Sequence, residues 1–405
     1  MVLAVFRFTF GRPKVNRGVR GRVAPETLGA WGRAGPTYHR YRITVIREKK
    51  GINNMNQQER LAATAAPLLD WYEKNKRDLP WRRTRDPYKI WVSEIMLQQT
   101  RVAAALPYYL RWMEELPDVN ALAAVEEERL MKLWQGLGYY SRARNLQRAA
   151  KVIVEELDGR FPDTWEELRK LPGVGDYTAG AVASIAFGRR VPAVDGNVLR
   201  VAARVADIRE NIMDPKVRRR MSELMAAAVP SDRPGTYNQA LMDLGATVCL
   251  PNGKPLCDAC PLSTLCEAHR LGLEEALPVR EKKASRRVEE LTVYLLVRDG
   301  RVALRKRPDR GLLAGLWEFP HVSGCLGEDA AGEPVAGWGL TPLEWRERLA
   351  ARHIFTHVEW RMTGYLLTVS GPGPEEFFWA DREALEGLAV PSAFGRFLEK
   401  IKEIL

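Results

Sequence analysis

Four of the five cysteines in this chain lie within a single segment of 18 residues, with the spacing Cys249-x7-Cys257-x2-Cys260-x5-Cys266. Small secreted domains stapled by disulfides spread their cysteines more widely than this. Zinc ribbons normally use two separated C-x2-C pairs, and only one such pair is present here. Four thiolates on one compact loop are typical of a [4Fe–4S] cube. We therefore expect these four cysteines to hold a [4Fe–4S] cluster in a reducing compartment, while Cys325 has no assigned role.

The bulk composition is that of an ordinary globular protein with two or three domains, because 405 residues with 46% hydrophobic and 28% charged side chains can bury a sizeable core. No stretch approaches the ~20 apolar residues of a membrane span. The apolar start, Met1–Phe10, has no basic residues before it and no clear cleavage site after it. A secretory signal is therefore not expected.

The net charge of +11 is concentrated at the N-terminus, where residues 1–50 carry 12 Lys/Arg and two Asp/Glu. Any DNA binding by the rest of the chain must therefore depend on local arrangement rather than on total charge. Residues 1–54 are interpreted as a basic, disordered extension. Two alternatives stay open: a wrongly assigned start upstream of Met55, or a mitochondrial transit peptide. The expected location is the cytoplasm with the nucleoid, or a mitochondrion or nucleus if the extension is a targeting segment.

Hydrophobic periodicity divides the remainder into an all-α domain over 55–279, a basic linker over 280–288 and an α+β domain over 289–405. The first is expected to contain roughly ten helices. Its predicted helices include 56–76, 88–100, 176–187 and 198–205, and the helix ending near Lys170 is capped by Asp163 or Thr164. Period-two patterns in the second domain predict strands at 291–297, 302–306 and 358–369, with a turn at Asp299-Gly300, followed by helices at 382–388 and 393–405.

The segment Leu171-Pro-Gly-Val-Gly175 joins two of these predicted helices. Gly173 and Gly175 would let the backbone turn tightly and present successive N–H groups at the start of the second helix. Such amides, together with the helix dipole, bind phosphate without reading sequence. A plain glycine-containing corner is the alternative. The small side chains of the second helix would let the two helices pack closely.

Two carboxylates are candidates for chemistry. Glu94 has apolar neighbours on its helix face, which would raise its pKa and keep it protonated near neutral pH. Asp195 stands just ahead of a helix, where an N-cap role is the ordinary reading. A Glu paired with an Arg at the rim of the core is the alternative for Glu94.

A protonated and an ionised carboxyl group suit cleavage of a glycosidic bond. A base within a duplex must be flipped out before it can be reached. Gln99, Tyr139 and Tyr140 are candidates to fill the gap left behind.

The hairpin, the Val-Asp-Gly-Asn segment at 194–197 and the cysteine loop together resemble the helix-hairpin-helix glycosylases that carry an iron–sulfur cluster. Residues 91–100 (WVSEIMLQQT), 134–142 (WQGLGYYSR) and 238–246 (NQALMDLGA) are similar to the adenine DNA glycosylase (MutY) branch of that superfamily. The resemblance runs from about residue 56 to near the C-terminus. It departs from the family between the first two cysteines, where seven residues stand instead of six, an extra residue that the loop should absorb locally.

The resemblance implies removal of adenine mispaired with 8-oxoguanine or guanine in double-stranded DNA, by a monomer. Glu94 would protonate adenine N7 and Asp195 would stabilise the oxocarbenium-like sugar, with Tyr177 and Asn197 in support. The related endonuclease III branch has a nucleophilic lysine where this chain has Tyr177, so little or no lyase activity is expected. Residues implied to contact DNA are Gln99, Thr100, Tyr139, Leu171, Gly173, Gly175 and Gln239.

The C-terminal domain resembles the MutT-like (Nudix-fold) lesion-recognition domain of the same family, on the strength of residues 307–320 (RPDRGLLAGLWEFP). The Nudix hydrolase signature is missing, so pyrophosphatase chemistry is not expected. Phe355-Thr356-His357 is similar to the Phe-Ser-His loop that probes the oxidised guanine, and Thr356 retains the hydroxyl. The alternative for His353 and His357 is a metal pair.

Two other functions remain to be compared with adenine removal. One is an endonuclease III-like glycosylase/lyase acting on damaged pyrimidines, against which Tyr177 argues. The other is a catalytically inactive iron–sulfur DNA-binding protein, against which the presence of both Glu94 and Asp195 argues.

Overall fold

The computed structural model describes residues 54–281 and 285–405. The basic extension predicted over 1–54 lies, apart from Asn54, outside the described residues. The middle of the predicted linker, 282–284, also lies outside them.

The described chain up to residue 281 is helical, as predicted. Its helices are α2 (Gln57–Ala62), α3 (Ala65–Asn75), α4 (Pro87–Met96), α5 (Val102–Glu115), α6 (Val119–Ala124), α7 (Glu127–Trp134), α8 (Ser141–Glu156), α9 (Trp165–Leu168), α10 (Asp176–Ile185), α11 (Gly196–Val205), α12 (Pro215–Ala228), α13 (Pro234–Thr247) and α14 (Glu267–Leu271). Short 3-10 turns stand at Pro80–Arg82 and Cys257–Ala259. None of the helices in the described ranges is long and apolar enough to cross a membrane.

Several predicted helices differ in extent from those observed. The single helix expected over 56–76 is wrong: it breaks at Ala63–Thr64 into α2 and α3, and Asn56 begins α2 with a capping box to Glu59. The helix expected over 88–100 ends at Met96. Gln99 has φ +58°, a left-handed conformation that no α-helix can continue. Thr164 caps α9 by accepting from the N–H of Glu167.

Two hydrophobic cores hold the helices together, and the candidate site takes residues from both. The first gathers α4, α5, α7, α8 and α10 around buried aromatics such as Trp112 and Trp134, whose rings meet edge to face at 5.4 Å. The second gathers α3, α11, α12 and α13. Glu94 belongs to an element of the first core, whereas Asp195 begins a helix of the second.

Glycines allow α10 to approach its neighbours at backbone distance. A Cβ on Gly180 would lie 2.1 Å from the carbonyl oxygen of Pro192, and a Cβ on Gly235 of α13 would lie 2.5 Å from the carbonyl oxygen of Ser184. The small-residue face of α10 therefore packs against the segment that leads to Asp195 and against α13. This close contact fixes the start of α10 near both carboxylates.

The remaining residues form a mixed sheet with three helices, which confirms the α+β prediction. The strands are β1 (Arg287–Arg298), β2 (Arg301–Lys306), β3 (Trp317–Glu318), β4 (His321–Ser323), β5 (Thr341–Ile354), β6 (Val358–Ser370) and β7 (Phe377–Ala380). The helices are α15 (Gly332–Gly337), α16 (Arg382–Gly387) and α17 (Gly395–Ile404).

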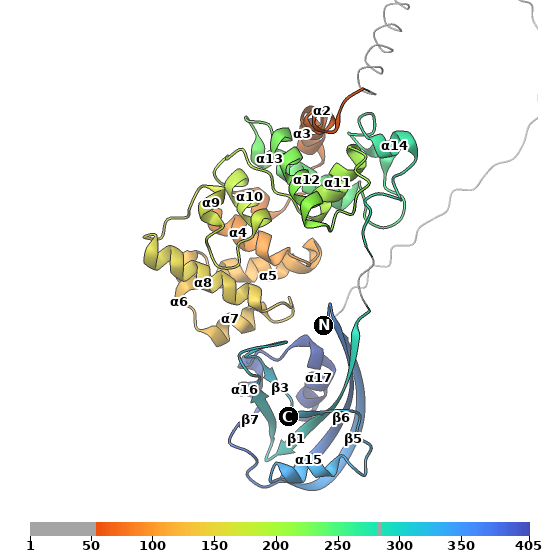
Figure 1. Ribbon diagram of the computed structural model, residues 1–405. Coiled ribbons are helices and arrows are strands. Elements are labelled where there is room, and N and C mark those ends of the chain that lie inside the picture. The colour runs from red at the N-terminus through yellow and green to blue at the C-terminus, as the bar shows by residue number, and fades with distance from the viewer. Residues whose placement is uncertain (1–53, 282–284) are drawn as a thin grey trace, which may run out of the picture. The chain divides into compact units, whose positions relative to one another are not determined.

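The central strand order is β3-β2-β1-β6-β5, with β1 parallel to β6 and β5 antiparallel to β6 (Figure 1). The predicted hairpin is present, and Asp299 and Gly300 turn it with φ of +49° and +67°, the sign that a tight two-residue hairpin turn requires. Helix α17 covers one face of the sheet, where Phe397 lies against Gly364 of β6. Strand β5 was not predicted, because most of its side chains are exposed and many are charged.

Gly180→Ala should destabilise the helical core by about 1–3 kcal/mol, because its methyl group would collide with backbone rather than with a flexible side chain. The free energy of unfolding in urea measures this. Gly387→Ala is the matched control, since a Cβ there meets no atom within 4 Å. Equal stability of the two variants would contradict the close packing described for α10.

Candidate active site

Glu94 lies on α4, which starts cleanly because Asp86 accepts from the N–H of Tyr88 (2.9 Å) and Pro87 occupies the first turn. The Glu94 side chain is only 4% exposed, and its Oε2 accepts a hydrogen bond of 2.5 Å from the Tyr177 hydroxyl. Burial raises the pKa of Glu94, and the charge of Asp195 adds to the rise, while the Tyr177 hydrogen bond and the positive charge of Arg82 oppose it. The carboxyl group therefore holds its proton more strongly than an exposed glutamate does.

Asp195 is the N-cap of α11, so the ordinary reading of this residue is confirmed. Its Oδ1 accepts from the backbone N–H groups of Asn197 and Val198, both at 2.8 Å, and its Oδ2 accepts from the Asn197 side-chain amide at 2.7 Å. Burial raises the pKa of Asp195, and these three donors oppose the rise. An N-cap and a charge-stabilising carboxylate are compatible roles, because the donors that cap the helix also stabilise the anion.

Tyr177 is hydrogen-bonded to Glu94 and lies within electrostatic reach of Asp195. It stands in the first turn of α10, and its hydroxyl also contacts Met242 Sδ at 3.6 Å. Burial and the negative charges of Glu94 and Asp195 raise its pKa well above the ordinary value, so the hydroxyl stays protonated and acts as a donor. The three predicted residues Glu94, Asp195 and Tyr177 are thus brought within electrostatic reach of one another, with Asn197 bonded to Asp195.

A charged group that the sequence analysis missed stands beside this site. Asp243 on α13 is fully buried and accepts from Arg77 Nη2 at 2.6 Å and from Arg82 Nη2 at 3.1 Å. Arg82 leaves its Nε and Nη1 buried without a partner, which makes them donors available to a ligand. The arginines follow a Leu-Pro-Trp turn at 79–81, but the sequence pattern alone does not show which of several neighbouring arginines turns inward.

Arg77 and Arg82 line an open pocket together with Tyr72 and Gln239. The Tyr72 hydroxyl donates to Gln239 Oε1 at 2.9 Å, which fixes the orientation of that amide. Arg82 therefore lines the pocket and acts electrostatically on Glu94 as well. A planar ligand with hydrogen-bonding edges would meet fixed donors and an amide here.

Of the residues predicted to contact DNA, Gln239 lies in α13, whereas those of the helical part before it lie in three turns. Gln99 is exposed and Thr100 follows it; Tyr139 is 46% exposed with φ +49°. Tyr140 is buried, so the expectation that it could also fill a gap in the base stack is not met. The hairpin Leu171–Gly175 turns at Gly173 with φ +75°, and Gly175 is the N-cap of α10.

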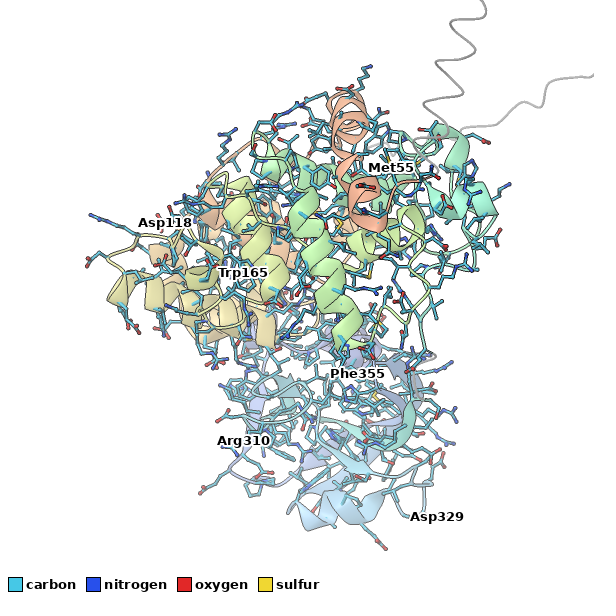
Figure 2. The ribbon with its side chains drawn as sticks, turned by 45° about the horizontal axis from the view of Figure 1, so that its top comes forward. Met55, Asp118, Trp165, Arg310, Asp329 and Phe355 are labelled. Carbon is cyan, nitrogen blue, oxygen red and sulfur yellow. The ribbon has the colours of Figure 1, made fainter. Side chains whose placement is uncertain are left out.

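Phe355, Thr356 and His357 form the turn between β5 and β6 (Phe355 is labelled in Figure 2). The turn is closed by a hydrogen bond of 2.8 Å from Phe355 N–H to the Val358 carbonyl, and the Phe355 ring packs on Trp360 with centroids 4.9 Å apart. The hydroxyls of Thr356 and Tyr139 are hydrogen-bonded to each other. Both residues line one pocket, which also includes residues 311–314.

The four clustered cysteines line one small cavity, and none of them forms a disulfide. Burial raises the pKa of Cys260 to about 11 and that of Cys266 to about 12, and the charges of the other cysteines add to both rises. Thiols with such a raised pKa lose their protons readily only when a metal centre binds the thiolate. Leu256 N–H closes the loop of the first spacing onto the Val248 carbonyl at 3.0 Å. Four thiols lining one cavity are a donor set that fits a metal cluster.

Two buried arginines join this loop to the rest of the site. Arg204 donates to Cys249 Sγ at 3.2 Å. Arg200 donates to the Cys249 carbonyl at 2.8 Å and to Asn197 Oδ1 at 2.9 Å. A continuous series of hydrogen bonds therefore runs from the cysteine loop to Asp195.

His353, one of the two histidines of the alternative metal pair, packs its ring on Phe355 with centroids 4.5 Å apart, and burial lowers its pKa. Within the ranges 54–281 and 285–405, the His, Cys, Asp and Glu side chains close enough to share a metal ion are Cys257, His269 and Glu274, at the edge of the cysteine loop.

Comparison with known proteins agrees with this geometry. Residues 92–227 match the HhH-GPD superfamily base excision DNA repair protein, and residues 292–400 match the NUDIX domain. The adenine DNA glycosylase of Rattus norvegicus is 39% identical over 401 residues, covering 83% of this chain and 77% of the relative. That of Homo sapiens is 38% identical, covering 82% and 73%. The solved structure of a thermostable thymine-DNA glycosylase covers 52% of this chain and 97% of its own, with 29% identity and a TM-score of 0.48.

The family match and the relatives thus show that the chain is a base-excision DNA N-glycosylase of the helix-hairpin-helix class. Within that class, the chain belongs to the adenine DNA glycosylase family. The predicted family, enzyme class and fold class are confirmed.

Asp243→Asn should lower the free energy of unfolding by about 3 kcal/mol, because it leaves two largely buried guanidinium groups without their counter-charge. Denaturant titration measures the loss. The matched control is Asp78→Asn, which should change the stability far less, since Asp78 pairs with Arg83 and both side chains are largely exposed. If Asp243→Asn were as mild as Asp78→Asn, the arginines would not depend on Asp243.

Proposed function

We propose that this chain hydrolyses the N-glycosidic bond of adenine mispaired with 8-oxoguanine or guanine in double-stranded DNA. The observation that carries the proposal is the buried Glu94 carboxyl group, hydrogen-bonded to Tyr177 and electrostatically coupled to Asp195. The relatives are adenine DNA glycosylases, which supports adenine as the base removed. The chain acts as a monomer.

Glu94 acts as the general acid. The adenine anion is a poor leaving group, so a ring nitrogen must be protonated before the bond breaks. A carboxylic acid with a raised pKa can protonate N7 near neutral pH. The Tyr177 hydroxyl holds the Glu94 carboxyl group in place at 2.5 Å and stabilises the carboxylate once the proton has gone.

Asp195 stabilises the positive charge that develops on the sugar as the bond breaks. The three donors that bind it favour its ionised form against the effect of burial, and Asn197 fixes its orientation. A negative carboxylate near an oxocarbenium-like sugar in a dry site is a strong electrostatic contribution to the rate. Water then completes the hydrolysis, and strand cleavage is not expected, because Tyr177 carries no amine to form a Schiff base.

The adenine must leave the helix to reach Glu94. Gly173, Gly175 and the start of α10 bind the backbone phosphates, with Leu171 packed beneath them, while Gln99 and Tyr139 enter the base stack and Thr100 supports Gln99. Gln239 and Arg82 bind the edge of the extruded base from the pocket wall. The phenolic ring of Tyr139 suits stacking against a neighbouring base.

The turn at Phe355–His357 recognises the lesion opposite the adenine. Its Thr356 hydroxyl is next to Tyr139, and a hydroxyl can hydrogen-bond the groups that distinguish 8-oxoguanine from guanine. Thr356, which recognises the lesion, and Tyr139, which enters the base stack, would then line the same pocket.

Cys249, Cys257, Cys260 and Cys266 would hold a [4Fe–4S] cluster, which would fix the conformation of the loop. Arg200 links that loop to Asn197, so an ordered loop helps to hold Asp195 in place. We propose a location with chromosomal DNA: the nucleoid in the cytoplasm, or a mitochondrion or nucleus if residues 1–54 act as a targeting segment.

The function is tested with a duplex that contains one adenine opposite 8-oxoguanine. Cleavage of the adenine strand only after alkali treatment supports a monofunctional adenine glycosylase. Cleavage without alkali, or at a pyrimidine, would instead support the endonuclease III-like alternative. No cleavage by a chain that still binds the duplex would favour the inactive DNA-binding protein.

Glu94→Gln should bind this duplex normally and slow adenine release by roughly 10²–10⁴-fold, the contribution of a general acid. In the wild type, the rate should fall as the pH rises through the raised pKa of Glu94, because the ionised form has no proton to give. Single-turnover rates across pH measure both effects. Glu155→Gln on the exposed side of α8 is the control and should change neither.

Thr356→Ala should reduce the preference for adenine opposite 8-oxoguanine over adenine opposite guanine by roughly fivefold, since one neutral hydrogen bond contributes about 1 kcal/mol. The ratio of the two single-turnover rates measures it. Thr356→Ser keeps the hydroxyl and should keep the preference. A preference that survives the alanine change would remove this contact from lesion recognition.

The purified protein should be brown, with a broad absorbance near 400 nm typical of such clusters (on the order of one cluster per chain). Cys260→Ser should lose this colour and much of the folded protein with it, whereas Cys325→Ser should keep the colour, because Cys325 is exposed and far along the chain from the loop. A colourless, zinc-loaded and active wild type would contradict the cluster.

A further inference from the structure

One arginine outside the groups described so far contacts both turns that carry the proposed wedge residues. Arg142 stands in the first turn of α8 and is 8% exposed. We use the name wedge loops for residues 97–100, which contain Gln99, and residues 136–139, which contain Tyr139. The two loops are separated in sequence by helices α5, α6 and α7.

The guanidinium group divides its donors between the two wedge loops. Nη1 donates to the carbonyls of Ile95 (2.8 Å), Met96 (3.2 Å) and Gln98 (2.7 Å), at the end of α4 and in the first loop. Nη2 donates to the carbonyls of Leu137 (2.9 Å) and Gly138 (3.1 Å) in the second loop. A planar fork with fixed donor directions can hold two separate sets of carbonyls at once, which a lysine ammonium cannot do in the same geometry.

Two of the hydrogen bonds of Arg142 lie at the peptide groups that directly precede the wedge residues. The Gln98 carbonyl belongs to the peptide group that leads into Gln99, and the Gly138 carbonyl belongs to the one that leads into Tyr139. The orientation of each of these peptide planes determines φ of the residue that follows. Gln99 and Tyr139 have φ of +58° and +49°, although neither is a glycine. Residues other than glycine rarely adopt this left-handed backbone conformation unless their surroundings impose it.

Neighbouring aromatic rings keep the guanidinium in place. Its central carbon lies 5.2 Å from the Trp134 ring centroid and 5.6 Å from that of Tyr139. Trp134 Nε1 also donates to the Gly138 carbonyl at 2.9 Å, which adds a second hydrogen bond at the same peptide. The cation is therefore buried among carbonyl oxygens and ring faces.

We propose that Arg142 is a positioning residue that imposes the left-handed conformation on both wedge residues together, so that Gln99 and Tyr139 are presented to the base stack as one preformed unit. The proposal rests on the wedge roles given under Proposed function. Preorganisation of this kind removes the cost of ordering two loops when the adenine is extruded. It acts on the flipping step and leaves the Glu94 and Asp195 chemistry unchanged.

The first test needs no activity. Hydrogen–deuterium exchange of the free protein should be faster in Arg142→Lys at both wedge loops and unchanged in α13. Arg129→Lys, an exposed arginine paired with Glu115, is the control and should alter neither loop. Faster exchange in only one loop, in neither loop, or throughout the helical cores would overturn the proposal. If Arg142→Lys does not fold, Arg142→Gln, which keeps a planar NH2 donor on a shorter side chain, is measured in the same way.

The second test is a double-mutant cycle on single-turnover adenine release. Arg142→Lys should slow release on the order of tenfold in the wild-type background, because small misplacements of positioned groups have effects of this size or larger. In a Gln99→Gly/Tyr139→Gly background the same change should cost less than about twofold, since the residues through which it acts are gone. Losses that multiply in full would overturn the proposal. If the wild type releases no adenine, the proposed function fails, and the exchange measurement still decides the role of Arg142.

Discussion

The hydrogen bond between Tyr177 and the buried Glu94 carboxyl group is the interaction on which the site depends. It is possible only because α4 buries Glu94 among apolar side chains and α10 brings its first turn against α4. Burial raises the pKa of Glu94, while Tyr177 and Arg82 favour the anion, so the pKa is set by the balance of these opposing effects. That balance is what a group needs in order to give up a proton during a reaction. Gly180 and Gly235 contribute from a distance, because they let α10 pack closely against the segment that leads to Asp195 and against α13.

Buried arginines are the second recurring feature of the helical part. Arg82, Arg142, Arg200 and Arg204 are all shielded from solvent, and the last three bind mainly backbone carbonyls of loops and helix ends. A carbonyl at a helix end has no partner within its helix, so a guanidinium group that reaches it satisfies a polar group and joins two elements. The loops of this protein are thereby held by directional bonds as well as by apolar packing.

Much of this arrangement could be predicted from the sequence. The helical first part, the α+β second part and the Asp299-Gly300 hairpin follow from periodicity and turn chemistry, and the buried Glu94 follows from its apolar neighbours. The break at Ala63–Thr64 and the early end of α4 could not be predicted, because continuous apolar spacing hides a local change of direction. The partners of Asp243 and Arg142 were also hidden, since each bonds to residues far away in the sequence. Strand β5 was not predicted, because an edge strand with exposed charges lacks the alternation of apolar and polar residues that marks a half-buried strand.

The short distance along the chain between Gly173 and Tyr177 has a further consequence. Gly173 lies in the turn just before the N-cap Gly175, and Tyr177 lies in the first turn of α10, so a phosphate bound at the proposed hairpin site would stand at a nearly fixed separation from the Tyr177 ring. Sliding of the duplex by one nucleotide would carry the sugar away from the acid by a full backbone repeat. The residues proposed to bind DNA without regard to its sequence would therefore also determine which nucleotide along the strand can be attacked.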